Sequence, residues 1–212
     1  MTIEKFAEIA IYGAQAISAL WGAFCVVMII MRTSQKNFSS EETQMQFLDE
    51  LGKPLKSGDF QTALQMCDGD ARVVPQLAHL AISHRDLGYS KIRQLLLDRF
   101  HRDVLSDLDV RMSWVNTVIK TAPMLGLFGT VVGMMFAFGK LAAAEHVKAD
   151  ALANDISLAL ITTVVGLAVA IPMIIALANC NIQIRSLEEG VSSGLTRFLE
   201  IFRESLSKEQ GR

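Results

Sequence analysis

Two threonines, Thr130 and Thr163, lie inside long stretches of sequence that carry no charged side chain. In an apolar surrounding, a lone threonine hydroxyl by default bonds a backbone carbonyl of its own helix. On two adjoining helices, the same hydroxyls can instead present a polar ring to something that moves between the helices. The chemistry that this pair suggests is the passage of an ion.

Small side chains accompany both threonines at helical spacing, and they include the GxxxG pair Gly129 and Gly133. Small faces let two helix backbones approach closely, so that van der Waals contact drives their association. Two interpretations stay open: the faces form a pore wall, or they only pack helices within one subunit. The small faces consist of Ala122, Gly126, Gly129, Gly133 and Ala137 in the first stretch and of Ala159, Thr163, Gly166 and Ala170 in the second.

Charged side chains are absent from three runs, 9–31, 121–139 and 156–184, although they make up 20% of the chain. A helix needs about 20 apolar residues to cross a bilayer. We therefore expect an integral membrane protein with three spanning helices. We also expect no ionisable group inside any span, so that a titrating carboxylate on a proton path must come from another chain.

The expected fold is an all-α membrane protein in which long cytoplasmic helices extend the spanning helices. Pro123 and Pro172 are expected to kink the second and third spans. The expected parts are an N-terminal segment at 1–8, spans at 9–31, 113–139 and 156–181, a cytoplasmic helical domain at 32–112, a periplasmic loop at 140–155 and a C-terminal helix at 182–212.

Helix signals fill the polar region after the first span. Residues 38–42 read as a loop that ends in an N-cap, and a helix is expected at 41–51, broken at 52–54. Residues 57–59 form a second helix start, and further helical patterns cover 71–84 and 91–109. The last of these is amphipathic and is expected to run directly into the second span. No convincing β alternation is found in the sequence.

The C-terminal tail carries an apolar stripe at helical spacing and is expected to pack against the polar domain or a sister subunit. Gln15 and Ser18 in the first span are candidates for hydrogen bonds to a neighbouring helix. For Ser18, a bond to a backbone carbonyl of its own helix is an equally good alternative. The stripe consists of Leu187, Val191, Leu195, Phe198, Leu199 and Phe202.

Basic residues indicate the orientation, because they gather on the cytoplasmic side of membrane proteins. They follow the first and third spans and precede the second, whereas the short loop carries a balance of charges. We expect the N-terminus and the loop in the periplasm and the C-terminus in the cytoplasm. The residues used are Arg32, Lys36, Arg99, Arg102, Arg111, Arg185 and Arg197, against Lys140, Glu145, Lys148 and Asp150 in the loop.

Other function classes find little support. The net charge of −2 implies no nucleic-acid partner. Cys25, Cys67 and Cys180 lack metal-ligand spacing and are expected to be small apolar residues. Three of the histidines, at positions 79, 84 and 101, form no ligand motif and are expected at the surface or in packing. No nucleophile, metal or phosphate motif suggests an enzyme, and no cofactor or metal site is expected.

Two segments resemble the paired signatures of the MotA/TolQ/ExbB proton channel family. They are PMLGLFGTVVGMMF at 123–136 and LALITTVVGLAVAIP at 158–172. The likeness covers about the last 100 residues closely, and three spans with a long loop after the first are similar to the ExbB/TolQ branch.

The resemblance implies a homopentamer in the bacterial inner membrane, a channel and motor that uses the proton motive force for biopolymer transport or similar work. Two copies of a single-span partner like ExbD or TolR, with a membrane aspartate, would sit inside the ring. Thr130 and Thr163 match the family's two pore threonines, which face that aspartate. The work would reach a periplasmic effector like TonB or TolA.

Two positions depart from the pattern or add to it. Leu158 stands where ExbB-type members often carry a glutamate, five residues before Thr163. Thr162 is an added hydroxyl, which could help to coordinate sodium or, as we favour, face a neighbouring helix. The remaining alternatives are a sodium-driven member of the family and a non-conducting membrane scaffold.

Overall fold

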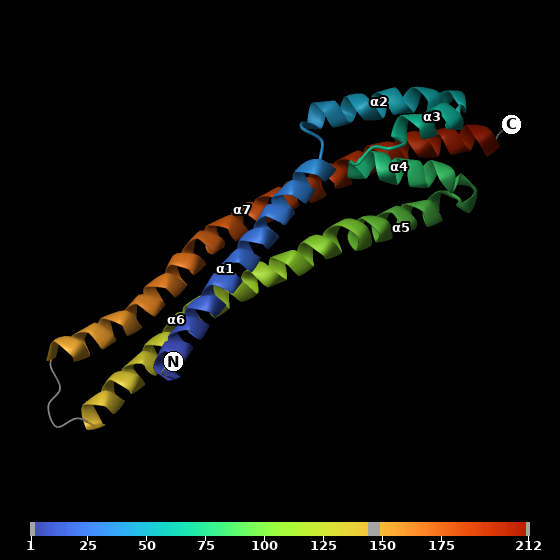
Figure 1. The fold of residues 1–212 in the computed structure, drawn as a ribbon. Coiled ribbons are helices and arrows are strands. Elements are labelled where there is room, and N and C mark those ends of the chain that lie inside the picture. The colour runs from blue at the N-terminus through green and yellow to red at the C-terminus, as the bar shows by residue number, and fades with distance from the viewer. Residues whose placement is uncertain (1–2, 144–148, 211–212) are drawn as a thin grey trace. The chain divides into compact units, whose positions relative to one another are not determined.

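The computed structural model describes residues 3–143 and 149–210, and these residues form helices with short connections and no β-strand. Figure 1 shows the order of the elements along the chain. They are α1 (Ile3–Lys36), α2 (Glu41–Ser57), α3 (Phe60–Cys67), α4 (Val73–Ser83), the 3-10 turn η1 (Arg85–Leu87), α5 (Tyr89–Phe100), the π turn η2 (His101–Leu105), α6 (Ser106–Ala143) and α7 (Ala149–Gln210).

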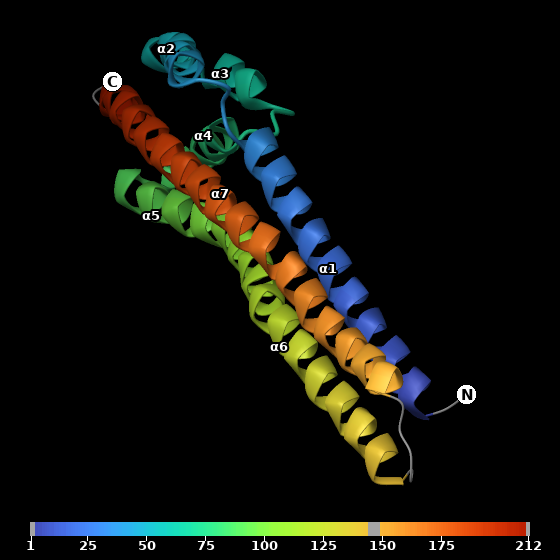
Figure 2. The same ribbon diagram turned by 90° about the vertical axis from the view of Figure 1, so that its left-hand side faces the viewer.

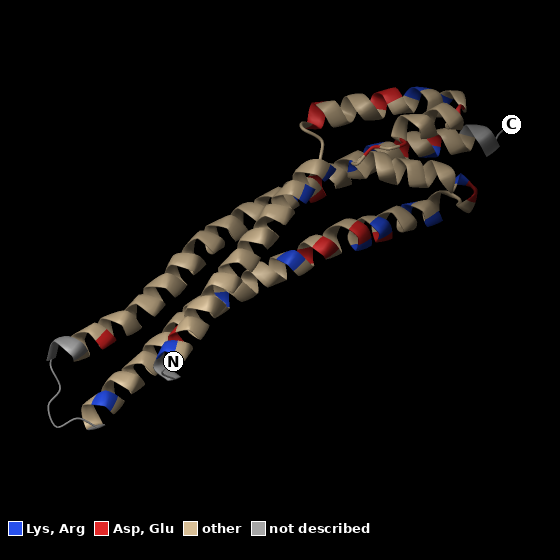
Figure 3. Cartoon of the chain, viewed as in Figure 1, with Lys and Arg blue, Asp and Glu red and all other residues tan. Residues whose placement is uncertain are grey.

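Three of the described helices, α1, α6 and α7, include stretches long and apolar enough to cross a membrane. Figure 3 shows long parts of all three without Lys, Arg, Asp or Glu. The expected all-α membrane protein is confirmed. Both α6 and α7 continue through their prolines, Pro123 and Pro172. Whether these prolines kink the helices stays a prediction.

The helices extend beyond the charge-free runs that predicted them. Helix α1 begins at Ile3, and the ends of the expected loop at 140–155 are helical, up to Ala143 and again from Ala149. The middle of that loop, 144–148, lies outside the described residues. The expected second span, 113–139, also contains Lys120, so the expectation that no ionisable group lies in a span is wrong for that span. The charge-free runs themselves contain no Lys, Arg, Asp or Glu.

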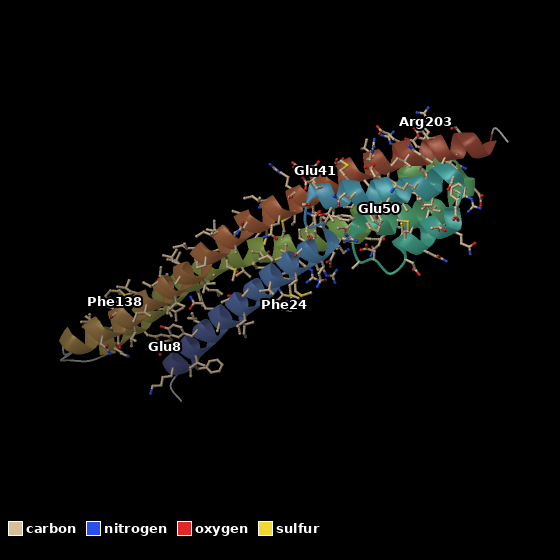
Figure 4. The ribbon with its side chains drawn as sticks, turned by 90° about the horizontal axis from the view of Figure 1, so that it is seen from above. Glu8, Phe24, Glu41, Glu50, Phe138 and Arg203 are labelled. Carbon is tan, nitrogen blue, oxygen red and sulfur yellow. The ribbon has the colours of Figure 1, made fainter. Side chains whose placement is uncertain are left out.

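The chain folds into two compact units. The first, which we call the membrane unit, comprises Met1–Met28 and Arg111–Cys180. In it, the first part of α1 lies alongside α6 and α7 in both ribbon views (Figures 1 and 2). Apolar side chains cover its outside, and Phe24 on α1 and Phe138 on α6 are each about half exposed (Figure 4). These side chains suit a lipid or subunit environment rather than water.

The second unit, which we call the polar unit, comprises Ile29–Val110 and Asn181–Arg212. Helices α2 to α5 supply apolar side chains to a common core with the last part of α7. The predicted stripe of the tail is buried in this core, from Leu187 to Phe202. The tail therefore packs against the polar domain of its own chain. The largest fully buried side chains of this unit are Ile29, Leu48, Leu51, Leu55, Ile82, Ile92, Leu96, Leu108, Leu187, Phe198 and Phe202.

The predicted break at 52–54 is wrong, because α2 continues through Pro54 to Ser57. A proline inside a helix removes one hydrogen bond and costs about 3 kcal/mol. Leu51 and Leu55 flank this site and are fully buried, so their packing offsets that cost. The helix ends at Gly58, whose φ of 83° is the left-handed conformation that glycine adopts most easily.

Other local predictions are confirmed. Ser40 caps α2 by accepting from the Thr43 amide at 3.2 Å, and Asp59 caps α3 by accepting from the Thr62 amide at 3.1 Å. Helix α5 continues through the π turn into α6, as the amphipathic pattern predicted. A single π turn of this kind often interrupts a long α-helix.

Candidate functional site

The small faces of α6 and α7 lie against each other within one chain. A Cβ atom on Gly126 would lie 2.8 Å from the Thr163 Cα, and one on Gly133 would lie 2.6 Å from the Ala159 Cβ. A Cβ on Gly166 would lie 2.5 Å from the Ala122 carbonyl oxygen. Only glycine allows backbones to approach this closely. The faces therefore pack the two helices together, and their role as a pore wall stays a prediction.

Alanines extend this contact beyond the glycines. Ala122 and Ala137 on α6 and Ala159 and Ala170 on α7 are all buried. Their spacing of three or four residues keeps them on one side of each helix. The sequence pattern thus identified one continuous contact seam along both helices.

Thr162 lies in this seam and joins the two helices through its hydroxyl. Its Oγ1 lies 3.0 Å from the Gly126 carbonyl oxygen on α6 and 2.7 Å from the Ala159 carbonyl oxygen on its own helix. One hydroxyl hydrogen is thus shared between two acceptors. The residue is buried, with 4% of its surface exposed. The expectation that Thr162 faces a neighbouring helix is confirmed.

Gln15 brings α1 to the same point. Its Nε2 donates to the Thr162 carbonyl oxygen at 2.9 Å, and the residue is 1% exposed. We call Gln15, Gly126 and Thr162 the polar junction, because one hydrogen bond joins α1 to α7 and another joins α7 to α6. Ser18, by contrast, donates to the Gln15 carbonyl oxygen at 2.8 Å in its own helix, the alternative that the sequence left open.

The two predicted ion-pathway threonines differ in how their hydroxyls are used. Thr130 is half-buried, and its hydroxyl donates to the Leu127 carbonyl oxygen at 2.7 Å in its own turn. The Thr163 hydroxyl is buried and has no hydrogen-bond partner among the described residues. Buried hydroxyls are normally bonded, so Thr163 carries an unsatisfied donor and acceptor in this structure, and its role in an ion pathway stays a prediction.

Thr130 and Thr163 lie near each other along the seam. The Thr163 backbone packs against Gly126, and Thr130 lies four residues further along α6, a rise of about 6 Å. Thr163 sits beside the polar junction, directly after Thr162. The two threonines therefore belong to one region of the membrane unit.

A cavity of about 50 Å³ opens between the three helices beyond Thr162. Two acids line it, Glu8 from α1 and Asp155 from α7, and Asp155 accepts from the Lys140 ammonium at 2.9 Å. Leu158 lines the same cavity. Sequence reasoning missed Glu8, because it used this residue only to mark the end of a charge-free run. Only the register of α1 against α7 reveals it.

Candidate metal ligands do not converge in the described part of the chain, where no group of three or more His, Cys, Asp or Glu could hold a metal ion. His79 is half-buried, and His84 and His101 are exposed. The three cysteines are free and buried. In the polar unit, burial and then the charge of Asp70 raise the pKa of the Cys67 thiol to about 12. That thiol is therefore neutral at physiological pH.

Comparison with known proteins identifies relatives for the part of the chain that builds this seam. The MotA/TolQ/ExbB proton channel family matches residues 76–192. The Tol-Pal system protein TolQ of Haemophilus influenzae is 33% identical over 97 residues, which cover 46% of this chain and 42% of the relative. The biopolymer transport protein ExbB of Xanthomonas campestris is 38% identical over 94 residues, 42% of this chain and 37% of the relative.

A third relative covers more of its own length. The biopolymer transport protein ExbB of Helicobacter pylori is 36% identical over 101 residues, which cover 47% of this chain and 68% of the relative. The chain spans less than half the length of the first two relatives. The family match covers more than half of this chain and includes both Thr130 and Thr163. The chain therefore belongs to the MotA/TolQ/ExbB proton channel family.

Proposed function

We propose that this protein is the ring-forming subunit of an inner-membrane proton channel that couples the proton motive force to mechanical work. The observation that carries the proposal is the buried Thr163 hydroxyl, which finds no partner among the described residues of its own chain. A protonated carboxyl group of a second chain is a suitable partner, since it can donate to the hydroxyl and accept from it.

The second chain is a single-span protein like ExbD or TolR with an aspartate in its membrane helix. The sequence of this chain, the names of its relatives and the chemistry of carboxylates support that assignment. The three charge-free runs contain no acid that could carry a proton. The names of the relatives, TolQ and ExbB, are those of Tol-Pal and biopolymer transport proteins. A carboxylate loses its charge on protonation and can then move through a low-dielectric wall.

The assembly is a homopentamer around two copies of the partner, with the N-terminus in the periplasm and the C-terminus in the cytoplasm. A periplasmic effector like TonB or TolA receives the work. The subunit has no catalytic activity of its own. The transported ion is the proton rather than sodium, because Thr162, the added hydroxyl, is buried between α6 and α7 with 4% of its surface exposed, where a cation does not reach its oxygen.

The test is Thr163→Val in the full chain, expressed with the single-span partner and reconstituted in vesicles. Valine keeps the shape and removes a hydroxyl that has no partner in the chain, so folding and assembly should not suffer. Proton flux driven by a membrane potential should fall at least tenfold. Full flux in the variant would exclude the threonine role.

Thr162→Val is the matched control for folding. It removes the hydroxyl that the Gly126 carbonyl oxygen accepts from, so it should weaken the packing of α6 on α7 and lower thermal stability. A single-span protein with a membrane aspartate should co-purify with the wild-type chain and with Thr163→Val. If no such protein co-purifies and no flux is measured, the chain is a non-conducting scaffold. The close packing of the small faces within one chain is consistent with that alternative as well.

A further inference from the structure

One exposed face of α6 changes from polar to apolar along its length. Ser113, Thr117 and Lys120 are exposed, and Met124 and Leu127 follow on the same face with 69% and 61% exposure. Their spacing of three or four residues places all five on one side of the helix. We call Ser113, Thr117 and Lys120 the polar stripe.

The polar stripe lies at a level where the neighbouring helices are apolar. A Cβ atom on Gly22 of α1 would lie 3.1 Å from the Val118 side chain of α6 and 3.3 Å from the Met173 side chain of α7. These three residues therefore share one level of the membrane unit. At this level α1 exposes Leu20 (73%) and α7 exposes Ile171 (57%).

The apolar stretches of α1 and α7 also continue past this level. The charge-free run of α1 ends at Met31, nine residues after Gly22, which is a rise of about 13 Å along the helix. The apolar run of α7 ends at Ala178, just before Asn179 and five residues after Met173, a rise of about 7.5 Å. Lys120 lies on the far side of Val118 from these ends. Its four-carbon stem is too short to bring the ammonium back to a headgroup layer at that distance.

The charge of Lys120 determines which surroundings, lipid or water, the polar stripe can have. A lysine in the middle of a spanning helix costs about 2.5–3.5 kcal/mol when lipid surrounds it. The hydroxyls of Ser113 and Thr117 can be satisfied within α6, as Thr117 shows by donating to the Ser113 carbonyl oxygen at 2.9 Å. Lys120 forms no ion pair within residues 3–143 and 149–210. Its charge therefore needs water or an anionic group beside it.

We propose that the polar stripe lines a water-filled space at membrane depth and that Lys120 makes this space favourable for anionic over cationic groups. The space lies on the side of Thr130 toward the start of α6, ten residues or about 15 Å away along the helix. The inference rests on the proposed function in that the space forms in the assembled protein. It does not depend on whether that assembly conducts protons.

The experiment is cysteine labelling of the full chain with its partner in membrane vesicles. Thr117→Cys is introduced after Cys25, Cys67 and Cys180 have been replaced by alanine, and its labelling rates with an anionic and a cationic methanethiosulfonate reagent are compared. Both reagents are membrane-impermeant and need water to reach the thiol. A unit charge one helical turn away should change each rate by about threefold and their ratio by about tenfold in favour of the anionic reagent.

Two matched variants make the result decisive. Leu20→Cys, at a similar level on α1, should stay unlabelled because its surroundings are apolar. Lys120→Gln combined with Thr117→Cys should keep the labelling and bring the ratio of rates to that of an exposed position in the polar unit, Ser83→Cys. If Thr117→Cys resists labelling like Leu20→Cys, or if Lys120→Gln leaves the ratio unchanged, the inference is overturned. Loss of proton flux in Thr163→Val would be a separate result, because labelling does not require flux.

Discussion

The side-chain amide of Gln15 donates a hydrogen bond of 2.9 Å to the carbonyl oxygen of Thr162 and thereby ties α1 to α7 at the seam between α7 and α6. The acceptor belongs to the backbone of a continuous helix, so it keeps its place when the donor is removed. The amide oxygen of Gln15 has no partner among the described residues. This bond therefore fixes the register of α1 against α7 more than it stabilises the two helices.

Gln15→Leu should lower the free energy of unfolding in detergent by only about 0.6 kcal/mol, the average for hydrogen bonds between membrane helices. Leucine keeps the volume and also removes the unpaired amide oxygen, which limits the loss. Ser18→Ala is the control and should change nothing measurable, because Ser18 bonds only its own helix. A loss above about 2 kcal/mol in Gln15→Leu would contradict this assignment.

Gly129→Ala should destabilise the membrane unit by about 1–3 kcal/mol, as overpacked cores do. The added Cβ would lie 2.5 Å from the Thr162 Oγ1 and 2.8 Å from its Cβ, so α6 and α7 would have to move apart. Gly139→Ala on the same helix has nothing within 4 Å and should stabilise the helix by about 0.5–1 kcal/mol. Thermal unfolding of both variants tests the pair, and equal effects would contradict the close contact at Gly129.

The sequence was sufficient for the helices and for the small faces, because both follow from spacing along one element. Residues three or four apart share a helix face whatever surrounds them. The sequence could not pair Gln15 with Thr162, because the two residues lie 147 positions apart and their bond depends on the register between α1 and α7. The same register places Glu8 at the cavity beside Leu158, and no local sequence pattern predicts that position.

At Pro54 the local sequence predicts a helix end that the structure does not have. Glycine and proline at 52–54 have low helix propensity and therefore predict a helix end. The burial of Leu51 and Leu55 in the core stabilises the helix enough to override this propensity. The use of each threonine hydroxyl was equally open. Thr130 follows the local default, Thr162 bonds across to α6, and Thr163 does neither within the described chain.

Arg72→Lys should destabilise the polar unit by about 0.5–1 kcal/mol, the range for an exposed cation–π contact. The Arg72 guanidinium lies 4.0 Å from the centre of the Phe38 ring while its Nε donates to the Asp70 Oδ1 at 2.9 Å. Lysine cannot stack and bond a carboxylate in a fork at the same time. Arg93→Lys, at an exposed position of α5, is the control and should have no effect.

The effect of Arg72→Lys should also depend on pH. The hydrogen bond from Arg72 holds the pKa of Asp70 below its usual value. Stability from a depressed carboxyl pKa is present above the unfolded pKa of about 3.9 and is lost as the pH falls. The difference between wild type and variant should therefore be larger at pH 6 than at pH 2.5. Denaturant unfolding at both pH values measures this difference in stability. If the difference is the same at both, it comes from the stacking of Arg72 on Phe38 alone and not from the bond to Asp70.

Cys67 gives a pH dependence of the opposite sign. Burial first and the charge of Asp70 second raise its pKa from 9.0 to about 12. An unfolded chain then releases this proton at lower pH than the native one, so stability is complete below pH 9.0 and falls as the pH rises toward about 12. The slope of unfolding free energy against pH in this window should be smaller in Cys67→Ala than in wild type.

Alkylation provides an independent measure of the same thiol, since only the thiolate reacts quickly. In a chain with Cys25 and Cys180 replaced by alanine, native Cys67 should react with iodoacetamide at pH 9 far more slowly than the urea-unfolded chain does. Asp70→Asn removes the nearby charge and keeps the burial, so it should speed the native reaction only slightly. A large acceleration in Asp70→Asn would mean that the carboxylate, and not burial, holds the thiol in its neutral form. Rapid alkylation of the native wild-type thiol would contradict the raised pKa itself.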